Sequence, residues 1–124
     1  MTEIPMTKTK INYDLEERTF QFAKNVVIFV RKLSKTVGSI EYGRQVIRSS
    51  GSVGSNYIEA NEALSKKDFK MRIKICRKEA KESAYWLRLI IETNDKKLEK
   101  EGRELLREAI ELKKIFSSII EKSK

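Results

Sequence analysis

The sequence contains no histidine, only one cysteine (Cys76), one proline and five glycines. Without histidine there is no imidazole base and no histidine-ligated metal, and a lone cysteine excludes a disulfide within the chain. The longest apolar run covers residues 26–30, far short of the roughly 20 residues that cross a bilayer. Residues 1–10 are polar and mixed in charge, unlike a signal peptide. We expect a cytoplasmic protein with no membrane partner, cofactor or metal.

The length of 124 residues suits a single hydrophobic core, and so a single domain. Charged residues make up 36% and hydrophobic residues 40% of the chain. With so few turn formers, this balance is typical of long amphipathic helices. We therefore predict an all-α fold with a polar N-terminal leader over residues 1–12 and one domain over residues 13–124.

Four apolar periods with steps of three and four residues predict four helices. Asp14 stands as the N-cap of a helix over 14–36, before a turn at Gly38 and Ser39, and a second helix covers 39–64. Ser65 begins the third helix in a capping-box-like pattern with Asp68, and residues 93–95 separate it from the fourth. Short connections then favour an antiparallel up-down bundle. The core-facing positions are Leu15, Phe22, Val26, Phe29 and Leu33; Tyr42, Val46, Ser50, Val53, Tyr57, Ala60 and Leu64; Phe69, Ile73, Cys76, Ala80, Ser83, Leu87 and Ile90; and Leu98, Leu105, Ala109, Leu112, Phe116 and Ile120.

The second predicted helix contains a run of serine and glycine over residues 49–55, which is typical of either a linker or a helix that permits close backbone approach. The apolar period continues unbroken from Val46 through Val53 to Tyr57, which favours a continuous helix. Beside this period runs a polar line, which we interpret as an interhelical hydrogen-bond network rather than a substrate site. Its members are Gln45, Ser49, Ser52, Asn56 and Glu59.

The net charge is +9, and more than half of the excess lies in residues 65–92, which carry nine basic and four acidic groups. At about 100° per residue, six of these cations share one face of the third helix, spanning about 30 Å at 1.5 Å per residue. This face could follow a phosphate backbone, or it could be a solvated face paired with the acidic residues of the fourth helix, Glu101, Glu104, Glu108 and Glu111. The six cations, here called the basic stripe, are Lys67, Lys70, Lys74, Arg77, Lys81 and Arg88.

Apolar side chains also lie away from the core-facing seams of the first and third helices. One core cannot absorb them, so self-association is a simpler explanation than scattered exposed residues. The predicted oligomer contacts are Val27, Ile28, Met71, Ile75, Trp86 and Leu89.

Two carboxylate pairs have the spacing used by magnesium-dependent nucleotide hydrolases: Glu59 with Glu62, and Glu79 with Glu82. Both pairs point away from the predicted seam, and Cys76 lies on it as a small buried hydrophobe. We therefore expect no enzymatic activity and no catalytic residue, with a nucleotide hydrolase as the rival hypothesis.

Several blocks of residues resemble a known family, most densely over residues 45–91. They are Gln45 to Ser49, Ser52 to Asn56, Glu59-Ala60, Ser65 to Phe69, Lys78 to Ala80 and Tyr85 to Leu87. Together they resemble the four-helix-bundle proteins encoded by intervening sequences of 23S rRNA genes, which include the accessory variability determinant of diversity-generating retroelements. The resemblance implies a protomer of a pentameric, barrel-like oligomer with a basic surface, and in the retroelement branch binding to nucleic acid and to a reverse transcriptase. It implies no catalytic residue.

The basic stripe and the resemblance together predict a non-catalytic accessory scaffold that binds RNA or DNA without sequence specificity. No aromatic residue is interleaved among the six cations, so we expect backbone contacts rather than base stacking. The alternative is a scaffold that binds a protein partner such as a reverse transcriptase.

Overall fold

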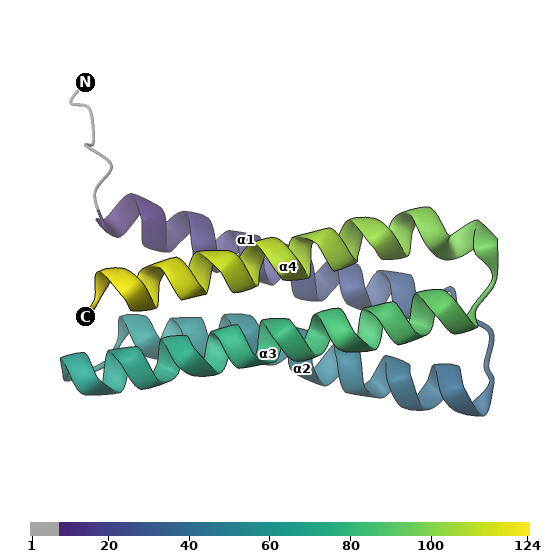
Figure 1. Cartoon of the computed structure of the whole chain (residues 1–124), viewed down its shortest axis with the longest axis horizontal. Helices are drawn as coiled ribbons and strands as arrows, with labels where there is room; N and C mark the ends of the chain where they lie inside the picture. The colour runs from purple at the N-terminus through teal and green to yellow at the C-terminus, as the bar shows by residue number, and fades with distance from the viewer. Residues whose placement is uncertain (1–7) are drawn as a thin grey trace, which may run out of the picture.

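Four antiparallel helices form the bundle in the computed structural model, which describes residues 8–124 and side chains from Leu15 onward (Figure 1). The helices are α1 (Lys8–Val30), α2 (Val37–Asn61), α3 (Lys66–Thr93) and α4 (Glu99–Lys122), and the 3-10 turn η1 (Lys96–Leu98) precedes α4. Each helix runs opposite to the one before it, and α3 and α4 form the layer nearer the viewer in Figure 1. The described residues contain no strand, and none of their helices is long and apolar enough to cross a bilayer.

The core is built from the predicted seams of all four helices. All but six of the predicted positions are buried hydrophobic side chains, with Phe22, Val26, Phe29, Ile73, Leu87 and Phe116 almost inaccessible. Ser50 and Ser83 are buried as predicted, and Tyr42, Phe69 and Leu98 pack at the edge of the core. The exception is Leu64, whose side chain is 99% exposed because α2 ends at Asn61 and Leu64 lies in the turn to α3.

The predicted ends of the first two helices are wrong by several residues. Helix α1 begins at Lys8, so the predicted N-cap at Asp14 lies inside it, and the predicted leader overlaps it at residues 8–12; residues 1–7 lie outside the described range. The same helix ends at Val30, yet Leu33 still reaches the core from the following turn. Gly38 lies within the first turn of α2 because Thr36 is the N-cap, with its hydroxyl accepting a hydrogen bond from Ser39 N at 3.1 Å.

The serine and glycine run in α2 is helical throughout, which confirms the continuous helix. Where α1 meets α2, a Cβ on Gly54 would lie 3.0 Å from the Thr19 hydroxyl oxygen, so this glycine permits close approach. Where α2 meets α3, the buried hydroxyls of Ser49 and Ser83 lie 2.7 Å apart. Asn56 accepts a hydrogen bond from Arg72 at 3.0 Å. Two of the five residues in the predicted polar line therefore form interhelical hydrogen bonds.

Candidate nucleic-acid interface

The basic stripe runs along the flank of α3 that faces away from α2. On the opposite flank, Ser83 and Cys76 of α3 bond to α2, which orients the helix in the bundle. On the stripe side, Glu92 forms an ion pair with Arg103 of α4 at 3.6 Å. Lys67, Lys74, Lys81 and Arg88 are exposed, whereas Lys70 and Arg77 are partly covered. The stripe therefore lies on the outer surface beside the junction of α3 and α4.

No cation of the basic stripe forms an ion pair within the described part of the chain. The acidic residues of α4 that would neutralise it face α1 instead. Glu108 receives two hydrogen bonds from Arg18, at 2.7 and 2.9 Å, and Glu101 pairs with Lys32 at 2.9 Å. The alternative in which the acidic face of α4 neutralises the stripe is therefore wrong. Six unpaired cations along one flank produce a positive potential that attracts polyanions.

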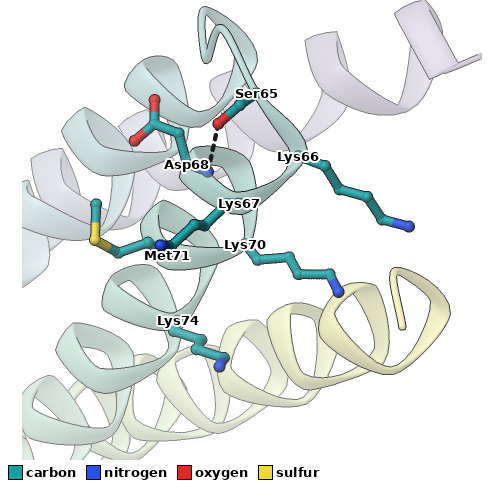
Figure 2. Close-up of a pocket in the computed structure, with 7 residues that line it drawn as sticks. All are labelled: Ser65, Lys66, Lys67, Asp68, Lys70, Met71 and Lys74. Carbon is teal, nitrogen blue, oxygen red and sulfur yellow. Dashed lines mark hydrogen bonds between the residues drawn. The ribbon is translucent and has the colours of Figure 1, made fainter.

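Four lysines gather at the N-terminal end of α3, around an open depression of about 730 Å³ (Figure 2). They are Lys66, Lys67, Lys70 and Lys74. The predicted N-cap is confirmed, because Asp68 N donates to the Ser65 hydroxyl at 3.0 Å. In Figure 2 the Asp68 carboxylate points to the side of the helix opposite Lys66 and Lys70. The positive end of the helix dipole adds to the charges of these four lysines.

Sequence reasoning missed two kinds of residue on this flank. Lys113 of α4 lies about three helical turns after Gly102, which packs against Ile91 of α3. Lys113 therefore lies on the α3 side of α4 and widens the basic surface. Tyr85 is 59% exposed and lies between Lys81 and Arg88 in the sequence, so the expectation that no aromatic residue interrupts the stripe is wrong. The helical phase of Tyr85, about 160° from Phe69, was the signal that could have placed it at the edge of the stripe.

The predicted oligomer contacts fall into exposed and covered groups. Met71 and Ile28 are exposed, whereas Val27, Ile75 and Leu89 are half-buried. Trp86 packs against the core, and its ring stacks on Tyr42 with centroids 5.9 Å apart, so a single protomer already covers much of this side chain.

A second apolar surface, which sequence reasoning missed on α2, lies along the junction of α1 and α2. Ile47 lies four residues after Gly43, and Ile58 lies four residues after Gly54. Both glycines pack closely against α1, so both isoleucines flank this junction. Phe20 lies four residues after Glu16, which pairs with Asn61 of α2. The exposed members, here called the apolar face, are Phe20, Ile40, Ile47 and Ile58. The common phase of the three isoleucines on α2 was the signal that could have found them.

The two carboxylate pairs lie at different levels of the bundle. Ser49 of α2 lies opposite Ser83 of α3, so Glu79 and Glu82 are near the level of Ser49. Glu59 lies about ten residues further along α2, which corresponds to roughly 15 Å. No group of three or more metal-binding side chains occurs within the described range. Glu79 is only partly covered, but its Oε1 atom is buried without a hydrogen-bond partner, and burial raises the pKa of this carboxyl group.

Cys76 is fully buried in the core, where its Sγ atom donates to Val53 O at 3.4 Å. Burial raises the pKa of its thiol to about 12. The thiolate that would act as a nucleophile is therefore strongly disfavoured at neutral pH.

This fold and surface define an all-α bundle with one cationic flank. The chain belongs to the family of 23S rRNA-intervening sequence proteins, which matches it over residues 12–118. It is also similar to the crystal structure of a protein of unknown function from the S23 ribosomal protein family of Bacteroides thetaiotaomicron VPI-5482, with 30% identity and a TM-score of 0.76. That likeness covers 89% of this chain and 97% of the other. A comparison with curated proteins finds no match. The resemblance to the intervening-sequence family is thus confirmed.

Proposed function

We propose that this protein is a non-catalytic accessory scaffold that binds nucleic acid through the phosphate backbone without reading its sequence. The observation that carries the proposal is the set of six cations on one flank of α3 without an ion pair in the described part of the chain. Unpaired lysine and arginine side chains gain free energy by releasing counterions from a polyanion. A solvated face that served only solubility would not require all six cations to lie on one side.

Self-association strengthens this function. A single stripe spans only about 32 Å, from Lys67 to Arg88 at 1.5 Å per residue. Several stripes in one oligomer engage the same strand at once, so weak contacts add through effective concentration. The family resemblance supports a pentamer, and the exposed apolar side chains of α1, α2 and α3 support association without fixing the number of subunits.

The direct test compares two triple charge reversals of equal net charge. Lys70→Glu with Lys74→Glu and Arg77→Glu reverses the stripe, whereas Lys24→Glu with Arg31→Glu and Lys35→Glu reverses exposed cations on and just after α1. Each variant lowers the net charge from +9 by six, to +3. Binding to structured RNA and to duplex DNA is titrated at two salt concentrations, after circular dichroism has shown that both variants fold.

We expect the stripe variant to lose affinity by at least about tenfold and to show a shallower salt dependence, whereas the α1 variant stays close to wild type. Equal binding by the two variants would show that total charge, not the stripe, drives association. Wild-type protein without salt-sensitive binding would leave the stripe as a docking surface for an acidic protein partner. Magnesium-dependent nucleotide turnover that is lost in Glu79→Gln would instead support the hydrolase.

A further inference from the structure

Tyr85 is the aromatic side chain that the basic stripe presents to solvent. Its side chain is 59% exposed on the outer surface of α3. Its neighbours at three and four residues are Lys81, Glu82, Arg88 and Leu89, and Lys78 lies two turns earlier on the same surface. Glu92 lies two turns later on the same surface, where it pairs with Arg103 of α4 at 3.6 Å. The three cations Lys78, Lys81 and Arg88 thus outnumber the two carboxylates around the exposed ring, and the local charge is positive.

The ring of Tyr85 is held in place by a row of aromatic side chains that begins in the core. Tyr42 of α2 stacks on Trp86, with ring centroids 5.9 Å apart and planes at 29°. Trp86 in turn meets Tyr85 edge to face, with centroids 5.2 Å apart and planes at 73°. Tyr42 and Trp86 both pack against the core cluster. Tyr85 is thus the outermost ring of a supported row, and little conformational entropy remains to be lost when a ligand covers it.

We infer that Tyr85 stacks on an unpaired nucleobase, and that the nucleic acid held by the basic stripe is single-stranded. This inference rests on the proposed function. In a duplex, the base faces are stacked on one another, and only an unpaired base can expose its face to a tyrosine ring. A cationic surface that follows the backbone, with an aromatic ring among its charges, is the usual arrangement for single strands that bind without sequence preference.

The experiment separates base contacts from backbone contacts by removing the bases. Binding is measured with a single-stranded DNA, with a strand of equal length whose nucleotides are abasic, and with an RNA strand of matching sequence. Tyr85→Ala removes the ring and Tyr85→Phe retains it. Leu64→Ala is the matched control, because Leu64 is an apolar side chain that is 99% exposed in the turn between α2 and α3 and does not belong to the apolar face.

We expect Tyr85→Ala to weaken binding to the two base-containing strands by roughly 5- to 150-fold, with Tyr85→Phe and Leu64→Ala within about twofold of wild type. On the abasic strand all four proteins should bind alike. The chain has one tryptophan, so the fluorescence of Trp86, which touches Tyr85, provides a second signal. It should change when base-containing strands bind and stay constant with the abasic strand.

The inference fails if Tyr85→Ala binds base-containing strands as wild type does, or if it loses equal affinity for abasic strands. In either case the proposed function still stands when the stripe reversal abolishes salt-sensitive binding of the same strands. Wild-type protein that binds neither kind of strand would overturn both.

Discussion

The α1–α2 side and the α3–α4 side of the bundle bury similar rows of apolar side chains but expose chemically different surfaces to solvent. Along α1 and α2 the outer surface carries the apolar face, whereas along α3 it carries the basic stripe. An apolar surface in water gains free energy by contact with another apolar surface, and salt does not screen that contact because it involves no charges. A cationic surface gains free energy from polyanions and is screened by salt. This difference is what the proposed self-association and the proposed nucleic-acid binding would each require.

The largest expected effect tests the proposed self-association, because charging the apolar face should dissociate the oligomer. Phe20→Glu with Ile58→Glu places two carboxylates on this face, and we expect light scattering to report a protomer near 14.5 kDa. Met71→Glu with Leu89→Glu tests the predicted contacts on α3 in the same way. If only the α3 variant dissociates, the apolar face of α1 and α2 is not the interface. Raising the salt should leave the wild-type oligomer intact while it weakens nucleic-acid binding.

Alanine substitutions at two glycines compare the packing at a surface position with the packing at a buried position. At Gly102 of α4 a Cβ would lie 2.7 Å from Ile91 and 3.1 Å from the tip of Phe29, whereas at Gly51 of α2 it meets nothing within 4 Å. Gly51→Ala should stabilise the protein by about 1 kcal/mol through helix propensity. Gly102→Ala gains the same stabilisation from helix propensity but overpacks the core, so the protein should lose about 1 kcal/mol of stability overall. Urea unfolding measures both, and stabilisation by both variants would show that Ile91 and Phe29 move at little cost.

Glu79 of α3 lies at the junction of α2 and α3, where the two sides of the bundle meet, and its partly buried carboxyl group should make stability there depend on pH. Burial first, and the charge of Glu82 second, raise the pKa of Glu79, so the folded state disfavours its carboxylate. The native protein therefore loses stability as the pH rises from the ordinary glutamate pKa through the raised value. Glu79→Gln lacks this loss, so its melting temperature should exceed that of wild type at pH 7, with the difference shrinking toward pH 4. Glu59→Gln, at an exposed position, is the control. A difference independent of pH would contradict this account.

The smallest effect concerns the other junction, between α1 and α4. Arg18→Ala removes the two-pronged ion pair with Glu108, and the exposed position limits the loss to about 0.5–1 kcal/mol. High salt should reduce this loss. Arg31→Ala, at an exposed position on the turn after α1, should cost less. Equal losses for the two variants, in denaturant unfolding at low salt, would show that the ion pair adds no stability.

The core was predictable from the sequence because burial along a helix repeats every 3.6 residues whatever lies opposite. Because of this periodicity, the core-facing positions of α2 could be predicted through its serine and glycine run. The side chain of Ser65 was enough to predict the start of α3. The ends of α1 were not predictable in this way. Leu33 keeps the apolar phase although it lies in a turn, so the pattern continued beyond the end of the helix.

The surface depended on how the helices pack. The sequence by itself determined that six cations share one face of α3, because that follows from helical geometry alone. Only the tertiary structure decided that they are unpaired, since it directs Glu101 and Glu108 of α4 toward Lys32 and Arg18 of α1. It also decided that Trp86 is covered by Tyr42 while Tyr85 is left in solvent. The phase of a residue identifies its face on one helix, whereas the neighbour that covers this face is set by the packing of the others.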